Sequence, residues 1–489
     1  MHRLRSCACA RRHRRVHPPS AFILLAPETT TDKDGGAARA IVDKEDQMGP
    51  YVDAVPSAEV LPARADVVIV GGGVIGVSAA WHLVSQGLSV VLCEKGHIAG
   101  EQSSRNWGWC RQAGRDMREM PLITESMRHW RGMAEAVGAD VGYHECGVLY
   151  IGANEEDEAG FQQWFDDASG YDTGARMVRG AELAKLMPGA SRAYRAGLFV
   201  PTDGRAEPQR AVPAMARAAQ ARGATLIAHC SVRALERSAG RVSGVVTSRG
   251  RIACDAVILA GGAWSSLFCA NEGVRLPQLK VLGTVLRTSP VENGPPTCGW
   301  LGDIGYRKRA DGGYTIGYSG HRYTPVSPEG FKYLREYTPL LKQNWRTIRP
   351  RFDSAAWREF RDRPGWNAEQ TSPFERTRTM DPQPSQRGVQ AAMDSMRRLY
   401  PAFNDARIVQ EWACYMDVTP DIIPYIGPAA SVPGLTVATG FSGHGFGIGP
   451  AAGRAAADVA TGRNAGIDLA PFSLDRFAPG MPIVPGGEI

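Results

Sequence analysis

The chain has 489 residues, of which 22% are charged and 43% hydrophobic, so it is long enough for about two or three globular domains with large cores. Its net charge of +6 comes from six arginines among the first 16 residues, and the remainder is formally neutral. A neutral folded part excludes nucleic acid as a partner, because such binding needs a basic face. The ten cysteines show no zinc or thioredoxin spacing, so we expect no metal site and a reducing, cytoplasmic location.

The N-terminal segment, residues 1–62, lacks hydrophobic periodicity and is expected to be disordered or over-extended. A second methionine, Met48, shortly precedes the first predicted strand and is the preferred translation start. A transit peptide within the first 27 residues is the alternative, since that stretch is rich in arginine and poor in acidic residues. No apolar run is long enough to span a membrane, although a peripheral membrane contact stays open.

The most informative segment is Ala65–Gly96, which has the pattern of a nucleotide-binding βαβ unit. Val67–Val70 predicts a buried parallel strand, and Gly71, Gly73 and Gly76 follow it with G-x-G-x-x-G spacing. In this motif the first glycine permits a tight turn, the second admits a pyrophosphate and the third lets the helix pack on the strand. The start of the helix then offers its positive end to the phosphates.

A second strand, Ser89–Cys93, places Glu94 at its end, where a carboxylate accepts hydrogen bonds from both ribose hydroxyls. The same charge disfavours a 2′-phosphate, so the motif favours FAD or NAD over NADP. Next comes Glu101–Asp116, a polar loop rich in tryptophan that we expect to fold over a ligand. Further patterns predict helices at Met117–Val137, Glu155–Ser169, Gly180–Met187 and within Gly204–Gly223, and strands at Cys146–Gly152, Thr225–Ala228, Val232–Glu236, Val242–Thr247, Arg251–Cys254 and Asp255–Leu259.

The second half of the chain predicts another sheet and a cap. Lys280–Tyr323 alternates as an antiparallel sheet does, with a hairpin turn at Asp311–Gly313. Pro328–Pro350 and Gln386–Leu399 read as amphipathic helices around a connector rich in proline and arginine. Gly434–Gly462 predicts a buried strand, a glycine-rich loop and a helix in which Pro450 suits the first turn.

This order of elements predicts a Rossmann-like α/β domain assembled from discontinuous segments, together with an α+β substrate domain that has a mixed or antiparallel sheet and a helical cap. The expected cofactor-domain parts are 63–116, 204–272 and 407–475. The expected substrate-domain parts are 117–203 and 273–406, and residues 476–489 form a tail. No feature of the sequence specifies an oligomeric state.

Four motifs in order resemble the D-amino-acid oxidase superfamily of FAD-dependent oxidoreductases, which includes D-amino-acid dehydrogenases, glycine and sarcosine oxidases and bacterial L-amino-acid deaminases. The resemblance covers about Ala65–Arg463 and rests on Gly71–Gly76 with Glu94, and on Gly204–Ala224, Val257–Ser265 and Thr419–Pro450. The Glu101–Asp116 loop is similar in particular to L-amino-acid deaminases, which carry a membrane anchor that this chain lacks.

The resemblance implies that FAD is the cofactor, bound along the four motifs. It implies that Ser103, Ser104 and Arg105 lie near the pyrophosphate and flavin, and that Val232 contacts adenine through its backbone. It also places His444 beside the flavin ring, where the following helix stabilises negative charge on the reduced ring. The complete set of expected FAD residues is Gly71, Gly73, Val74, Ile75, Gly76, Glu94, Lys95, Ser103, Ser104, Arg105, Val232, Gly261, Gly262, Trp264, Gly443, His444, Gly445 and Phe446.

The implied reaction removes a hydride from the carbon next to an amine nitrogen and gives an imine that water hydrolyses to an oxo acid. Related enzymes place an arginine just before the T-P-D motif to hold the substrate carboxylate, but this chain has Met416 there. We therefore expect Arg307 or Arg322 on the hairpin strands, or Arg111 in the tryptophan loop, to replace it. We expect an aromatic wall in the substrate site, formed by Trp107, Trp109, Tyr318 and Tyr415. Such a wall favours an apolar or N-alkylated substrate.

Several alternatives stay open at the level of sequence. Cys414 has the spacing at which monomeric sarcosine oxidases attach flavin covalently, but a buried structural thiol is the simpler interpretation. Demethylation of a sarcosine-like or dimethylglycine-like substrate is a second enzymatic hypothesis. A flavin-binding electron-transfer or assembly subunit is a third. Oxygen and a quinone are both possible electron acceptors.

Overall fold

The predicted βαβ unit forms the centre of a six-stranded sheet. In the computed structural model, which describes residues 49–345, 347–478 and 480–486, β1 (Val67–Val70) pairs in parallel with β2 (Val90–Cys93) on one side and β13 (Ala256–Leu259) on the other. Strands from distant parts of the chain thus lie side by side, which confirms the predicted discontinuous α/β fold. The remaining strands are β9 (Thr225–Ile227), β21 (Leu435–Thr439) and the antiparallel edge strand β20 (Tyr425–Pro428).

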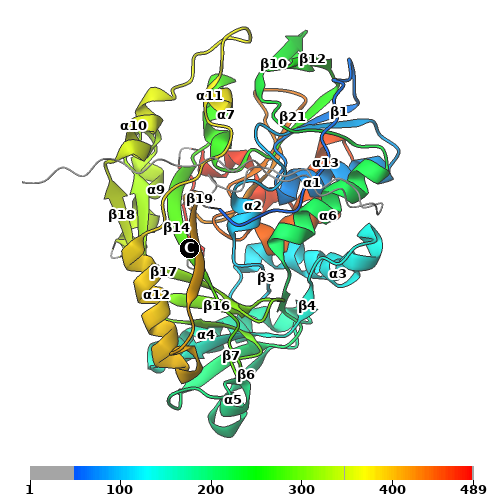
Figure 1. Ribbon diagram of the computed structural model, residues 1–489. Helices are drawn as coiled ribbons and strands as arrows, with labels where there is room; N and C mark the ends of the chain where they lie inside the picture. The colour runs from blue at the N-terminus through cyan, green and yellow to red at the C-terminus, as the bar shows by residue number, and fades with distance from the viewer. Residues whose placement is uncertain (1–48, 346, 479, 487–489) are drawn as a thin grey trace, which may run out of the picture. The chain divides into compact units, whose positions relative to one another are not determined.

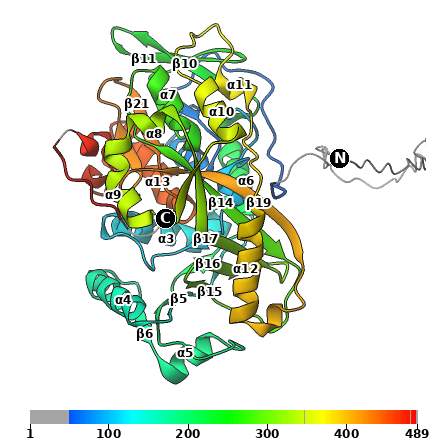
Figure 2. The ribbon, with the colours of Figure 1, turned by 90° about the vertical axis from the view of Figure 1, so that its left-hand side faces the viewer.

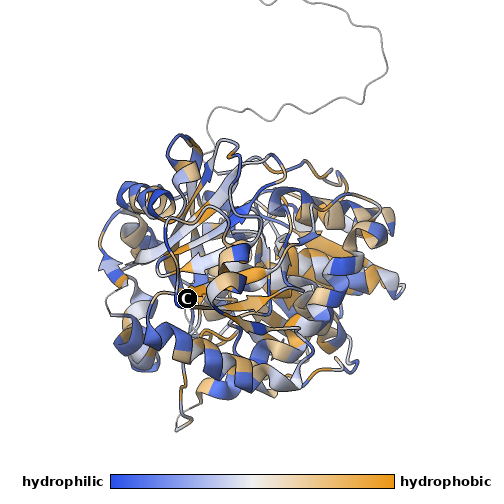
Figure 3. Ribbon diagram, turned by 90° about the horizontal axis from the view of Figure 1, so that it is seen from below, coloured by the Kyte–Doolittle hydropathy of each residue, from blue (hydrophilic) through white to orange (hydrophobic). Residues whose placement is uncertain are grey.

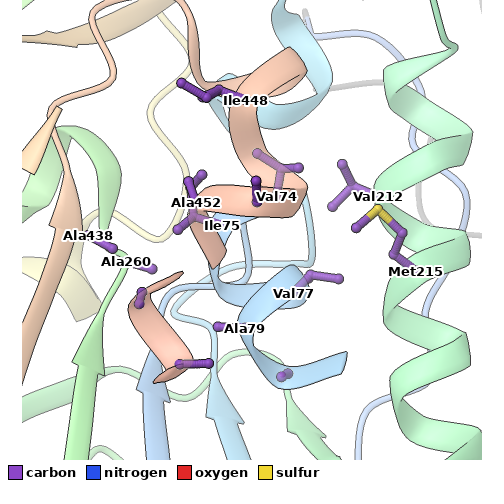
Figure 4. Packing of buried hydrophobic residues seen from close by; sticks show 14 of the residues in the cluster. Val74, Ile75, Val77, Ala79, Val212, Met215, Ala260, Ala438, Ile448 and Ala452 are labelled. Carbon is purple, nitrogen blue, oxygen red and sulfur yellow. The ribbon is translucent and has the colours of Figure 1, made fainter. Parts of the chain in front are cut away.

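One face of this sheet is covered by four helices. Side chains alternate along β1, so that Ile69 faces these helices and Val68 faces the opposite layer. Figure 4 shows how α1 lies between the other helices, with Val212 on one side and Ile448 and Ala452 on the other. The helices are α1 (Val74–Ser85), α3 (Met120–Val137), α6 (Pro208–Ala221) and α13 (Gly445–Ala460).

The contacts of α3 bear on the predicted domain boundaries. The sequence assigned residues 117–203 to the substrate region, but α3 packs on α13 and shares the core of α1 and α6. The described residues belong to one compact unit that is not divided further, so the other predicted domain boundaries stay a prediction. Residues 49–62 of the N-terminal segment that was expected to be disordered or over-extended are instead held against the domain: the Asp53 N–H donates to the carbonyl oxygen of Gln209 at 3.1 Å, and the Ala58 N–H to that of Leu226 at 2.8 Å, so the expectation is wrong for this part. The predicted start at Met48 and the transit peptide lie outside the described residues. Helix α13 begins at Gly445, so Pro450 stands beyond the first turn that the sequence analysis gave it.

The opposite face of the six-stranded sheet is covered by a three-stranded antiparallel meander and a short helix. The meander confirms the succession of short strands expected before β13. Its elements are β10 (Val232–Ser238), β11 (Arg241–Thr247) and β12 (Gly250–Ala253), and the helix is α7 (Ser265–Asn271).

A nine-stranded sheet forms the second half of the structure. The predicted hairpin is present, with its turn at Asp311–Gly313, but β15 (Cys298–Leu301) pairs in parallel with β5 (Val148–Gly152), so the sheet is mixed. No sequence pattern marks that pairing, because the two strands are far apart in the chain. The other strands are β19 (Ile408–Val418), β14 (Leu279–Thr288), β17 (Tyr314–Pro325), β16 (Ile304–Lys308), β7 (Ala196–Val200), β6 (Arg176–Val178) and β18 (Ile348–Arg351).

Helices cover this sheet on its outer side, and α12 (Gln386–Leu399) packs along β14, β16 and β17 (Figure 1). Pro328–Pro350 was predicted as one helix, but it forms two helices followed by β18, which adds to β17. Figure 2 shows this cap and, below it, α4 and α5 beside β6. The helices are α8 (Pro328–Lys332), α9 (Leu334–Asn344), α10 (Ser354–Arg361), α11 (Pro373–Arg376), α4 (Glu155–Asp167) and α5 (Gly180–Leu186).

The tryptophan loop contains short elements that join the two halves. They are α2 (Gln102–Arg105) and β3 (Trp109–Cys110), which pairs with β8 (Gly204–Arg205), itself paired with β4 (His144–Glu145). Hydrophobic residues gather on the inner strands, and hydrophilic residues on the outer helices (Figure 3). Within the described residues no helix has the length and apolar character needed to cross a membrane, and no cluster of His, Cys, Asp or Glu side chains is arranged for a metal ion. Short 3₁₀ helices occur at Met117–Glu119, Ala168–Gly170, Gly262–Trp264, Pro401–Phe403, Ala470–Phe472 and Leu474–Phe477.

Candidate active site

A cavity of about 780 Å³ runs from the six-stranded sheet to the nine-stranded sheet. This volume is within the range of small-molecule and cofactor sites. The carboxyl ends of β1, β2 and β13 and the starts of α1 and α13 line one part of the cavity, and β14, β17 and β19 line the other. The tryptophan loop lines it between these two parts, as expected for a loop that covers a ligand.

Glu94 lies at the end of β2 and lines the sheet end of the cavity. Its two carboxylate oxygens accept hydrogen bonds from the backbone N–H groups of Gly72 and Gly96, both at 2.7 Å. Burial raises the pKa of Glu94, although Lys95 and these two N–H groups act in the opposite direction. The carboxylate is thus held in one orientation, at the place where the motif requires an acceptor for ribose hydroxyls.

The phosphate-binding part of the motif is built from main-chain groups. The N–H of Val74, at the start of α1, donates to Ser103 Oγ at 2.8 Å, which connects the glycine-rich turn to α2. Nearby, Lys95 and Trp264 share Glu101: the Lys95 Nζ lies 2.7 Å from its carboxylate and the Trp264 Nε1 lies 3.1 Å from it. Burial acts to raise the pKa of Glu101, but the Lys95 charge and the hydrogen bonds from Lys95, the Met380 N–H and Trp264 together outweigh it and lower that pKa. The expected cofactor residues at this end therefore form one hydrogen-bonded frame.

His444 lines the cavity immediately before α13 and contacts a buried ion pair. Its Nδ1 lies 3.6 Å from Glu119 Oε2, and its carbonyl oxygen accepts a hydrogen bond from Arg115 at 3.2 Å. Arg115 and Glu119 are themselves 3.5 Å apart. Burial lowers the pKa of His444, and the Arg115 charge lowers it further, against the opposing effect of Glu119, so the neutral imidazole is favoured. Positive potential here comes from the start of α13 and from Arg115.

These features fit FAD by the chemistry of their groups. The glycine turn and the start of α1 supply N–H donors for a pyrophosphate, and Glu94 supplies the acceptor for a ribose. Most of the expected FAD residues line the cavity: Gly71, Gly73, Val74, Ile75, Glu94, Lys95, Ser103, Arg105, Val232, Gly261, Gly262, Trp264, Gly443, His444, Gly445 and Phe446.

Two expected FAD residues do not line the cavity. Ser104 is buried, and its carbonyl accepts a hydrogen bond from Gln209 of α6 at 2.5 Å, so it joins α2 to α6 beside the cavity. Gly76 instead allows α1 to approach the turn, since a Cβ there would lie 2.0 Å from the carbonyl oxygen of Gly71. That is the packing role that the motif assigns to its third glycine.

At the other end of the cavity, Arg322 and Tyr318 of β17 line the wall together with Met416 of β19. Arg322 and Tyr318 are 6% and 7% exposed, and burial raises the pKa of Tyr318. Met416 lies close to the glycine loop, because a Cβ on Gly443 would lie 3.0 Å from its sulfur. The position where related enzymes have an arginine therefore faces the cavity with an apolar side chain.

Arg111 also lines the cavity and is enclosed by aromatic rings. Its guanidinium carbon lies 5.8 Å from the ring centre of Trp109 and 5.7 Å from that of Tyr150. Such contacts between cations and rings are favourable, particularly where water is excluded. Arg111 and Arg322 are thus both placed to meet an anionic group in the cavity.

Arg307 does not line the cavity, and its prediction as the carboxylate anchor is wrong. Its side chain is fully buried, and both terminal nitrogens donate to the carboxylate of Glu207, at 2.9 and 3.0 Å. Its Nε donates to the carbonyl oxygen of Trp107. A guanidinium that is fully buried outside the cavity and bonded in this way holds the tryptophan loop to the sheet and does not reach a substrate.

Aromatic side chains line the cavity as predicted, but they are not all the residues that were predicted. Trp107 contacts Trp109 and Trp300, with ring centres 5.4 and 5.5 Å apart, and Trp300 stacks on Tyr150. The Trp107 ring packs directly on the sheet at Gly317, which has no side chain. A Cβ on Gly317 would lie 1.9 Å from this ring. Tyr415 was wrongly included, because alternation along β19 turns Cys414 and Met416 toward the cavity and Tyr415 toward a separate small pocket.

The sequence analysis missed several lining residues. Trp300 and Tyr150 lie on predicted strands, but only the parallel pairing of β15 with β5 brings them together. Asp417 lines the cavity and accepts a hydrogen bond from Gly440 N–H at 2.8 Å, which ties β19 to the loop before α13. Cys414 is buried, and burial raises the pKa of its thiol to about 11. The thiol therefore stays protonated, and a protonated thiol is a poor nucleophile.

Comparisons with known proteins agree with this geometry. The family model for DAO, the FAD dependent oxidoreductases, matches residues 66–459. The chain is 27% identical to glycine oxidase from Pseudomonas aeruginosa, over 83% of this chain and 98% of the relative. Its structure resembles L-amino acid deaminase from Proteus vulgaris with a TM-score of 0.83 and 33% identity, over 88% of this chain and 100% of the other. It resembles L-amino acid deaminase from Proteus myxofaciens, solved with anthranilate, with a TM-score of 0.83 and 32% identity, over 88% and 97% of the two chains.

The family match covers most of the chain, and most of the expected FAD residues line a single cavity. The chain therefore belongs to the DAO family of FAD-dependent oxidoreductases.

Proposed function

We propose that the protein oxidises the C–N bond of an amino acid with a large apolar or aromatic side chain. The observation that carries this proposal is the combination, in one cavity, of Arg322 with an aromatic wall. A carboxylate binds a guanidinium well, and a large apolar group binds a wall of rings. The likeness to two L-amino acid deaminases favours the L configuration.

In this proposal the residues of the chain bind and orient the substrate. Arg322 holds the carboxylate, with Arg111 beside the aromatic rings as a second cation, and Trp107 and Trp300 hold the side chain. The rings exclude water from the reacting carbon, which strengthens the ionic contact and keeps that carbon oriented. When bound, FAD supplies the hydride acceptor, and the oxidised substrate hydrolyses to an oxo acid.

The FAD-loaded protein tests the proposal by anaerobic bleaching of the flavin band near about 450 nm. We expect L-phenylalanine and L-leucine to bleach it, and glycine and sarcosine to do so at least about tenfold more slowly, since they lack a side chain that fills the wall. Formaldehyde release from N-methyl substrates would instead establish the demethylating function. A band that no amine bleaches would establish an electron-transfer or assembly subunit.

We also propose that the enzyme works in the cytoplasm, in peripheral contact with an anionic membrane. The segment 328–361 is net positive, and five of its large apolar side chains are more than half exposed: Phe331, Leu334, Trp345, Phe352 and Trp357. Exposed aromatic residues with basic neighbours suit a lipid interface. Such a contact favours a lipid-held quinone over oxygen as the electron acceptor.

Sedimentation with vesicles tests the membrane contact. We expect the protein to bind vesicles that contain phosphatidylserine, and the double variant Phe352→Glu/Trp357→Glu to bind them about tenfold less, because both rings are exposed. Reduction of a short-chain quinone faster than of oxygen would support the acceptor. Equal sedimentation of the two proteins would contradict the contact.

A further inference from the structure

Two cysteines outside the proposed active-site chemistry lie next to each other in the nine-stranded sheet. Cys146 directly precedes the turn into β5, Cys298 is the first residue of β15, and their sulfur atoms are 3.8 Å apart. The N–H of Cys298 donates to the carbonyl oxygen of Gly147 at 3.1 Å, which holds the two backbones side by side. A small rotation of the side chains is therefore sufficient to bring the sulfurs within bonding distance.

We propose that Cys146 and Cys298 form a reversible thiol–disulfide site that is oxidised by peroxide. Cys146 is partly exposed and Cys298 is fully buried, so the reagent reaches Cys146 first. The remaining described thiols are Cys93, Cys110, Cys230, Cys254, Cys269 and Cys414, all of them buried. Exposure and a neighbouring thiol are together what distinguish a redox-active cysteine from a structural one.

The electrostatic surroundings favour Cys146 as the attacking group. The Cys298 thiol, as a hydrogen-bond donor to the other sulfur, lowers the pKa of Cys146, and the nearby Arg205 guanidinium lowers it further against the effect of burial. Burial raises the pKa of Cys298, so this thiol keeps its proton. One member of the pair is thus a thiolate near neutral pH and the other resolves the product.

The chemistry balances with hydrogen peroxide as the only co-reactant. The Cys146 thiolate attacks one peroxide oxygen, an S–O bond forms, the O–O bond breaks, and the leaving hydroxide takes up a proton to become water. Cys146 is now a sulfenic acid. The Cys298 sulfur then attacks the Cys146 sulfur, the S–O bond breaks, and a second water leaves with the Cys298 proton. Two thiols are oxidised to one disulfide while one peroxide is reduced to two waters.

A disulfide here would join β5 to β15 behind the aromatic wall. Tyr150 on β5 pairs in register with Trp300 on β15, and both rings line the cavity. β15 and the segment from Cys146 through β5 thus carry both the cysteine pair and two members of the wall. The proposal does not depend on the substrate, because the oxidation needs only the two thiols and peroxide.

The experiment treats the FAD-loaded protein with hydrogen peroxide, blocks remaining thiols by alkylation and maps the peptides. We expect a Cys146–Cys298 cross-link that dithiothreitol removes, with Cys269 still alkylated. Cys298→Ser should abolish the cross-link and leave Cys146 as sulfenic acid, whereas Cys269→Ser, a buried thiol in α7, should leave the cross-link unchanged.

A second variant guards against a folding artefact. Arg205→Gln keeps both cysteines, and it should slow alkylation of Cys146 at pH 7 by about threefold or more, because the thiolate loses a neighbouring positive charge. The proposal is overturned if peroxide leaves both thiols alkylatable, if Cys93–Cys230 cross-links in preference, or if Arg205→Gln reacts as fast as the parent protein.

Discussion

Replacing Arg322 with methionine lowers kcat/KM for an amino acid by about 100- to 1,000-fold, the expected cost of leaving a buried carboxylate without its cation. The reason is the position of Arg322, which lines the cavity on β17 and is 6% exposed. The same variant should change kcat/KM for the corresponding amine without a carboxylate by less than about threefold, because that substrate makes no ion pair. Steady-state kinetics with both substrates measures the difference.

A matched arginine separates the anchoring role from a structural one. Arg307 lies on β16, the hairpin strand that precedes β17. It is paired with Glu207 and does not line the cavity. Arg307→Met should therefore remove the bidentate partner of the buried Glu207 carboxylate, leaving Arg205 at 3.7 Å as a cation, and lower the free energy of unfolding by about 3 kcal/mol. Urea unfolding should show this loss for Arg307→Met. Equal losses of activity with the acid and with the amine in Arg322→Met would assign the anchor to Arg111.

The contrast between these two arginines shows what the sequence could predict and what it could not. Both stand on the predicted hairpin, and nothing local distinguishes them. The partner of Arg307 is Glu207, which precedes α6 about a hundred residues earlier, and only the folded chain brings the two together. Local motifs, by contrast, place Gly71–Gly76 at the turn from β1 into α1 and Glu94 at the end of β2, as the structure has them, because a βαβ unit is defined by neighbours in sequence.

The same distinction explains the aromatic wall. Trp107 and Trp109 were expected from the tryptophan loop alone, whereas Trp300 joins them only through the parallel pairing of β15 with β5. Tyr415 was misplaced for another reason: β19 was not predicted as a strand, so the alternation that turns Tyr415 away from the cavity could not be applied. Long-range pairing and strand phase are therefore the two pieces of information that the sequence lacked.

Substituting Gly76 by alanine abolishes stoichiometric FAD binding and lowers the free energy of unfolding by about 3 kcal/mol or more, since overpacking against backbone has no cheap relaxation. The added Cβ would lie 2.0 Å from the carbonyl oxygen of Gly71 and 3.2 Å from a methyl carbon of Ile69. Helix α1 must then move away from β1, and the N–H groups at its start move with it. The absorbance of flavin per protein after purification, and urea unfolding, measure the two effects.

Gly132→Ala is the matched control for this substitution. Gly132 lies within α3, and nothing lies within 4 Å of the Cβ that alanine would add. Because glycine is unfavourable inside a helix, this variant should gain about 0.5 to 1 kcal/mol and bind FAD fully. Full flavin content in Gly76→Ala, with an unfolding transition like that of the parent protein, would show that α1 tolerates displacement from β1. The cofactor site would then depend on Glu94 and on the loop before α13, rather than on the close contact between α1 and the glycine turn.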